Sequence, residues 1–416
     1  MRNKSLRRIG LESRIEDLVE ESTVVVADPA AAVPGAEVVP AETVIVVPTS
    51  DAELAAVAEA QAEAGDTTDA IDELAVVADR LNEVRSNIEA TIPNGGLTQG
   101  EAVAYQCATN AIVADVGVTD VLPAMENFGA SMSRKEATTA SLEALDKVVE
   151  KVIARGKELM VSLGEKLMKL IQRIVAYFTS DKARLEKLKA ALNSAKGGSV
   201  RVTMPTEIAA LMTNQGASKF FQLVENSVGA ALNATKGLLD NPAKVAESVI
   251  GKSILPGASK RPAGKADSFS STVGLVELTE IVPHEAAELT DYELTIDNKG
   301  DGTRDVTLSK SDVAVVIDVL LKEATDSKLK AMVEGAAGKA VTKSGFDNLE
   351  SWANNDKSEG VNEIVTSVRH TAHARLTFAT QAVSLYGQIF QGLVSSVSKT
   401  VSKLNSAEAG KLENKA

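Results

Sequence analysis

The chain has 416 residues and a formal net charge of −13, and 44% of its residues are hydrophobic while only 3% are aromatic. So few aromatic residues, with one Trp, favour a helical, modestly packed protein and make an enzyme less expected. The single cysteine, Cys107, excludes an internal disulfide framework and a cysteine-based zinc site, and we expect it to fill a helix face.

Charge is segregated along the chain. Residues 1–14 carry +4, whereas the segment from Ile15 to Asp79 holds sixteen Asp and Glu residues and no Lys or Arg. Residues 80–143 add −4, and the remainder from Ala144 onward carries +3. The sequence therefore predicts an acidic front, residues 1–143, joined to a slightly basic body, residues 144–416.

Residues 1–70 are predicted to form an acidic N-terminal region rich in Ala, Val and Pro. An apolar face at 6–19 predicts a short amphipathic docking helix, and prolines at 29, 34, 40 and 48 predict an extended linker over 24–50. The region is either an ordinary disordered acidic tail or a segment with a removable (propeptide) or targeting role. The N-terminus has basic residues but no apolar segment behind them, so we expect no secretory signal.

Residues 71–253 are predicted to form a helical body. Apolar residues recur at helical spacing from Ile71 to Val84, and "PNGG" at 93–96 ends that helix. Two capping boxes then predict helix starts, Thr98 with Glu101 and Ser133 with Glu136.

The segment 134–195 is predicted to be a basic amphipathic helical hairpin, with a first helix from about Arg134 to Phe178. Its apolar stripe consists of Val149, Val152, Met160, Leu163, Leu167, Leu170, Ile171, Ile174 and Phe178. Its candidate basic contact face consists of Lys147, Lys151, Arg155, Lys157, Lys166, Lys169 and Arg173. Packing inside the protein explains the stripe, while contact with a membrane or with another partner, including weak non-specific contact with DNA phosphates, stays open. No run of about eighteen apolar residues occurs, so stable membrane insertion is not expected.

Beyond this segment we expect a short strand and further helices, then a flexible basic loop at 254–272 and a small β insert at 273–310. In the insert, "YELTIDNKGDGTRDVTLS" alternates on both sides of a turn and predicts a β-hairpin. A calcium loop is disfavoured because Lys299 and Leu308 occupy positions where an EF-hand needs ligands.

Residues 311–416 are predicted to form a C-terminal helical segment, which Ser311 caps and which ends in a long helix or helix pair. His370 and His373 share a helical face, but no acidic residue lies between them and arginines flank them, so a metal site is disfavoured. The predicted fold class is thus mainly α, with long amphipathic helices, helical hairpins, a small β-hairpin insert and a disordered acidic N-terminal region.

The order of these elements resembles the internal head proteins of large, jumbo-type tailed bacteriophages. The resemblance is most specific over the amphipathic segment at about 131–195 and weaker over about 360–404, which includes "ATQAVSLYGQIFQGLVSSVSKTVSKL". Residues 197–350 add nothing to it. It implies a structural virion protein without catalytic residues or cofactors, made in the host cytoplasm and packed in the capsid with the genome and other head proteins.

The resemblance also implies trimming by a head maturation protease that cuts after Glu in a small-x-Glu motif. Ser141, Leu142 and Glu143 match this motif, as do Gly10 to Glu12, Gly35 to Glu37 and Ala286 to Glu288. A cut after Glu143 would remove a segment of net charge −16 and leave a body of +3. The alternatives are a helical scaffold unrelated to DNA and a membrane-active protein delivered into a host cell.

Overall fold

The computed structural model describes residues 51–114, 116, 133–195, 198–213, 215–355 and 361–413. The chain divides into two units, Met1–Val44 and Ile45–Ala416, and all described residues belong to the second. The docking helix expected at 6–19 and the linker expected at 24–50 lie outside the described residues. Residue 70 does not mark a structural boundary, because the helix α2 (Asp51–Glu89) runs through it.

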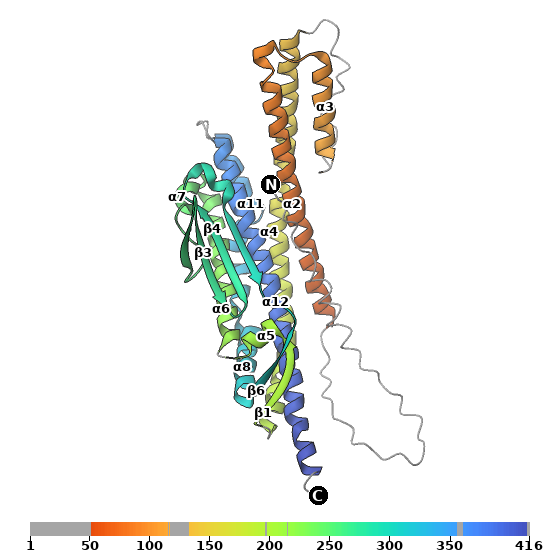
Figure 1. Ribbon diagram of the computed structural model, residues 1–416, viewed down its shortest axis with the longest axis vertical. Helices are drawn as coiled ribbons and strands as arrows, with labels where there is room; N and C mark the ends of the chain where they lie inside the picture. Colours follow the sequence, from red (N-terminus) through yellow and green to blue (C-terminus); the bar gives the residue numbers. More distant parts are fainter. Residues whose placement is uncertain are drawn as a thin grey trace, which may run out of the picture. The chain divides into compact units, whose positions relative to one another are not determined.

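Three long helices form the framework: α2, α4 (Arg134–Ser194) and α12 (Val361–Glu413). Phe178 of α4 stacks on Phe390 of α12 with ring centroids 3.7 Å apart, and Ile174 lies beside Gly387, so these two helices run parallel. Contacts from α2 to both helices follow the opposite order along the chain, which makes α2 antiparallel to them (Figure 1).

The segment 134–195 is one continuous helix, so the predicted hairpin is wrong. Neither Gly nor Pro occurs between Phe178 and Ala195, and the apolar spacing continues through Leu185, Leu188 and Leu192, all of which are buried. The expected capping box at Ser133 and Glu136 begins α4. The apolar stripe packs inside the protein, as expected: all of its residues are buried except Val149, which is half-buried.

The helix α2 and the helix α3 (Gln99–Ala114) share a second, smaller core with the N-terminal part of α4. The helix α2 ends before "PNGG", as expected, and the turn before α3 places Gly95 and Gly96 at positive φ. The capping box at Thr98 and Glu101 is present. Leu81, Leu97 and Val148 are among the fully buried residues of this core. The described part of the acidic front from Asp51 to Ala114 is therefore folded onto the body, and Cys107 on α3 is exposed rather than packed.

The remaining helices pack against α4 and α12 on the side away from α2. They are α5 (Thr206–Leu211), α6 (Gly216–Asp240), α7 (Val245–Val249), α8 (Lys310–Asp326), α9 (Lys328–Glu334), α10 (Ala336–Ala340) and α11 (Lys343–Asn355), with short 3-10 turns η1 (Ile92–Asn94), η3 (Pro242–Lys244) and η4 (Ala286–Asp291). The cap of α8 is Ser309, paired with Asp312, and not Ser311 as expected, because strand β6 (Thr303–Ser309) leads directly into the helix.

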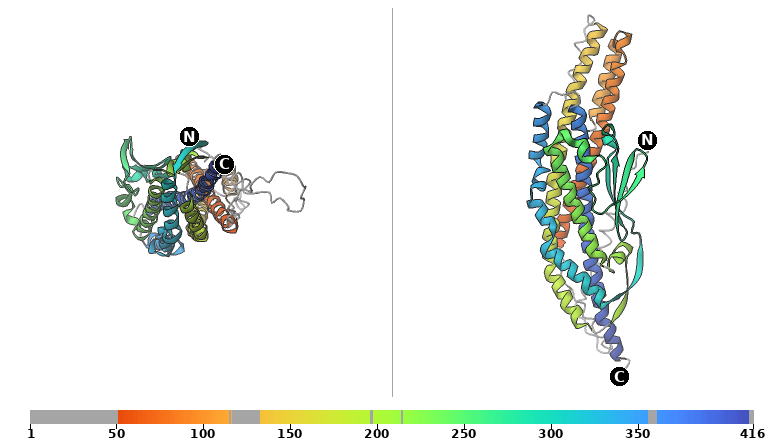
Figure 2. Two further views of the ribbon diagram at one scale, coloured as in Figure 1. Left: turned by 90° about the horizontal axis from the view of Figure 1, so that it is seen from below. Right: turned by 90° about the vertical axis from the view of Figure 1, so that its left-hand side faces the viewer.

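Two antiparallel sheets lie on one side of these helices (Figure 2). One has the order β2 (Ser259–Ala263), β3 (Ala266–Val273), β4 (Val276–Pro283), β5 (Glu293–Asn298), and the other pairs β1 (Ser199–Pro205) with β6. The expected hairpin between β5 and β6 is therefore wrong: β5 pairs with β4, and β6 pairs with the distant β1, with Val202 opposite Val306. The expected basic loop at 254–272 instead contains β2 and most of β3.

Candidate functional site

The seven predicted basic residues do not form one surface, because they point to different neighbours. Lys157 forms ion pairs with Asp347 and Glu350 of α11 at 2.8 and 2.6 Å. Lys169 forms an ion pair with Glu63 of α2 at 2.9 Å. The structure thus brings acidic residues from two other helices onto the basic side of α4.

Lys166 is also engaged by α2. Its ammonium group donates to the Glu63 carbonyl oxygen at 3.0 Å and to Thr67 Oγ1 at 2.7 Å. The hydrogen bond from Lys169 is the largest of the causes that lower the pKa of the Glu63 carboxyl below its ordinary value. These pairs are partly solvated, so they fix the register of α2 on α4 more than they stabilise the fold.

The other basic residues lie nearer to solvent. Arg155 pairs with Glu158 on its own helix at 2.9 Å, and Lys147, Lys151 and Arg173 are exposed. The exposed part of the predicted contact face therefore lies mainly on the N-terminal half of α4, at Lys147, Lys151 and Arg155.

The processing motif at Ser141, Leu142 and Glu143 lies inside α4, eight or more residues after the Ser133 cap. Glu143 is exposed and Leu142 is half-buried, but the Ser141 side chain is only 8% exposed. A protease would therefore meet a helical, partly covered segment here, and cleavage requires local opening of the helix.

The other three matches to the motif have different surroundings. Ala286, Ala287 and Glu288 lie in η4, where Glu288 accepts a hydrogen bond from Lys265 at 2.7 Å. The matches ending at Glu12 and Glu37 lie outside the described residues.

The two histidines on α12 do not face a common ligand position. His370 Nε2 lies 3.1 Å from the carbonyl oxygen of Tyr292, whereas His373 Nδ1 lies 3.8 Å from Asp72 of α2. Burial lowers the pKa of His373 to about 4, with a smaller contribution from His370, so its ring is neutral at neutral pH. No group of three or more His, Cys, Asp and Glu residues in the described ranges is placed to hold a metal ion.

Two buried polar clusters went unpredicted. In the first, Tyr292 donates to Glu280 at 2.8 Å and accepts from Arg375 Nε at 3.2 Å, and Glu280 also accepts from Ser253 Oγ and the Ile254 amide. This cluster ties α12 to the four-stranded sheet through two charged residues that are at most 1% exposed.

In the second cluster, Glu225 of α6 and Glu323 of α8 meet Tyr386 of α12. Each carboxyl lies on an apolar helix face: Glu225 lies next to Val224 and four residues after Phe221, and Glu323 lies three residues after Leu320. A charged residue inside an apolar helical pattern indicates a buried charged group, and this is the sequence feature that could have predicted the cluster.

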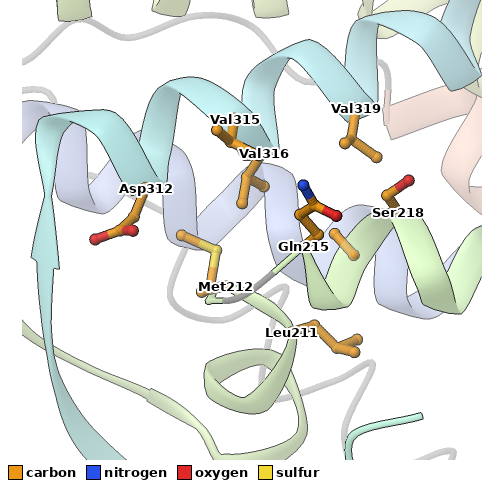
Figure 3. Close-up of a pocket in the computed structure, with 9 residues that line it drawn as sticks. Leu211, Met212, Gln215, Ser218, Asp312, Val315, Val316 and Val319 are labelled. Atoms are coloured by element: carbon orange, nitrogen blue, oxygen red, sulfur yellow. The ribbon is translucent and has the colours of Figure 1, made fainter.

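A small pocket of about 220 Å³ lies between the start of α6 and α8, near the end of α5 (Figure 3). Six of its nine lining residues are apolar, and the polar ones are Gln215, Ser218 and Asp312. Asp312, the one charged residue of the lining, is committed to the cap of α8.

Within the part of the chain that the structure describes, no helix is both long enough and apolar enough to span a membrane.

Comparison with known proteins identifies the family. Searches of curated proteins and of solved structures gave no match. A family model described as phiKZ-like phage internal head proteins matches residues 50–413, which is the stretch from the start of α2 to the end of α12. Because this match covers most of the chain, the protein belongs to the family of phiKZ-like phage internal head proteins.

Proposed function

We propose that the protein is packed in the capsid together with the genome, after synthesis in the host cytoplasm, and that a head maturation protease removes its acidic front. Membership of the family supports the general role, that of a structural protein in the interior of the phage head. The segregation of charge supports the finer part, because the front up to Glu143 has a net charge of −16 and the remainder of +3.

DNA repels an acidic chain and attracts a basic one through its phosphates. Removal of the front would therefore reverse the sign of the protein's interaction with the packaged genome. The exposed basic residues Lys147, Lys151, Arg155 and Arg173 on α4 would then supply weak, sequence-independent phosphate contacts.

The packing of α2 constrains when a cut after Glu143 can take place. The α2 residues Leu74, Val77 and Leu81 are buried against Leu145 and Val148 of α4, directly after the motif. Once formed, this apolar packing would hold the front on the body even after the chain is cut, so we propose that cleavage after Glu143 precedes the packing of α2 on α4. Other head proteins would then cover the apolar face of α4.

The location is tested by protease protection of purified particles. We expect added protease to leave this protein intact in closed particles and to degrade it once the heads are opened by osmotic shock. A surface-exposed capsid protein from the same particles serves as the control, since it should be cut in both samples. Degradation of this protein in closed, DNA-filled particles would exclude an interior location.

A further inference from the structure

A pair of buried carboxyl groups joins four helices. Glu225 is 3% exposed and Glu323 is 8% exposed. The Tyr386 hydroxyl donates to Glu323 Oε2 at 2.6 Å, and Glu225 Oε1 accepts from the backbone amide of Lys328 at 2.9 Å. The Ser327 hydroxyl, which caps α9, lies 3.2 Å from the same oxygen of Glu225. The two carboxyls therefore connect α6, α8 and α12 to the beginning of α9.

The two carboxyls have different hydrogen-bond donors. Glu225 Oε1 accepts from the Lys328 amide and faces the Ser327 hydroxyl at the start of α9, whereas Glu323 Oε2 accepts from the Tyr386 hydroxyl. Burial, together with the adjacent charge of Glu225, raises the pKa of Glu323 to about 7, although the hydrogen bond from Tyr386 lowers it. Glu323 is therefore protonated below about pH 7 and ionised above it.

We propose that Glu225, Glu323 and Tyr386 form a pH-responsive clasp that holds α9, α10 and α11 on the helical body when Glu323 is protonated and loosens them when it ionises. Ionisation places two negative charges side by side in a buried position, and the repulsion acts on Glu225, the residue that anchors the start of α9.

The other titratable groups around the pair do not cancel this effect. Lys322 on α8 lowers the pKa of Glu323, but less than burial raises it. Lys328 on α9 extends its ammonium group toward Asn226 Oδ1 at 3.5 Å, and Asp318 on α8 is paired with Lys189 of α4. Burial raises the pKa of Tyr386 far above neutrality, so its hydroxyl stays a donor throughout the range.

Opening the clasp would uncover a specific surface. Leu329, Val341 and Phe346 on the α9–α11 segment are at most 1% exposed, and the Val341 carbonyl lies where α4 has Gly164. Release of the segment would expose these side chains together with the α4 and α6 faces that they cover, which is a large apolar surface for another head protein.

The sign of the pH effect follows from linkage. A carboxyl whose pKa is higher in the closed state than in the open state favours closure fully below its ordinary pKa of 4.5, and this contribution is lost as the pH rises through about 7. A difference of this size corresponds to an increase of roughly two orders of magnitude in the opening constant between acidic and mildly alkaline pH.

Hydrogen exchange of the full-length protein at pH 5 and pH 8 tests the clasp, after correction for the intrinsic exchange rate. We expect the opening constant of the α9 amides to rise roughly fiftyfold in the wild type. In the Glu323→Gln variant, whose side chain has no proton to lose, the opening constant should be nearly the same at pH 5 and pH 8. Asp318→Asn, which removes an exposed acid from the same helix, should behave as the wild type.

Equal protection of α9 at both pH values in the wild type would overturn the proposal, even if the Glu323→Gln variant failed to fold. A pH dependence that persists unchanged in Glu323→Gln would also overturn it. Because the measurement uses the isolated folded chain, its outcome is independent of whether the protein is packed with DNA or processed.

Discussion

Replacing Glu280 by glutamine is expected to lower the free energy of unfolding by about 3–5 kcal/mol. Glu280 is fully buried, and its carboxylate accepts from Tyr292, Ser253 and the Ile254 amide. The substitution replaces one acceptor oxygen by a donor and leaves the buried Arg375, linked to Glu280 through Tyr292, without a compensating charge. Urea unfolding followed by circular dichroism measures the loss.

A double-mutant cycle with Arg375→Met separates this loss from a general packing defect. If the two charges act through Tyr292 as one unit, the double variant should be more stable than the sum of the single losses predicts, by about 1–3 kcal/mol. Additive losses would show that the cluster does not couple α12 to the sheet. Glu293→Gln, at an exposed position on β5, should change stability by less than about 0.5 kcal/mol and serves as the control.

Gly164→Ala is expected to destabilise the protein by about 3 kcal/mol, although alanine is the better helix former. A Cβ atom at Gly164 would lie 2.0 Å from the carbonyl oxygen of Val341, which is backbone and cannot move away as a side chain would. The helix α4 would have to separate from the turn between α10 and α11. Thermal unfolding should therefore begin at a lower temperature in the variant.

Gly237→Ala provides the matched control for this substitution. Gly237 also lies in a helix, α6, but a Cβ atom there would meet no atom within 4 Å. The alanine variant should be more stable than the wild type by about 0.5–1 kcal/mol. If both alanine variants gained stability, the close approach of Val341 to α4 would be wrong.

The helical part of the fold could be predicted because its signals are local. The capping boxes at Ser133 and Thr98 begin α4 and α3, and the apolar spacing from Ile71 to Val84 is the buried face of α2. The same spacing continues past Phe178, so the predicted break in α4 came from expecting a hairpin partner rather than from any turn residue.

The strand pairing could not be predicted because it is not local. A hairpin between β5 and β6 satisfies the alternation on each side of "NKGDG", but the structure gives β6 a partner about a hundred residues away in the sequence, with Leu308 opposite Val200. Nothing in the local pattern distinguishes these two pairings, since both bury the same alternate residues.

The seven basic residues of the candidate contact face do not form a single surface, again because of contacts that are distant in the sequence. Helical spacing places Lys157, Lys166 and Lys169 on polar sides of α4, but it cannot show that α11 and α2 bring Glu350 and Glu63 onto those sides. The buried carboxyls had a visible signal, since Glu225 interrupts an apolar stripe, but its partner Glu323 lies almost a hundred residues away.

The measurement that most directly tests the proposed role is the intact mass and N-terminal sequence of the protein from purified, DNA-filled heads. We expect a mature chain that begins immediately after a small-x-Glu motif, with Ala144 as the first residue when the cut follows Glu143. A full-length chain that begins at Met1 or Arg2 would contradict processing and show that the acidic front stays in the particle with the genome.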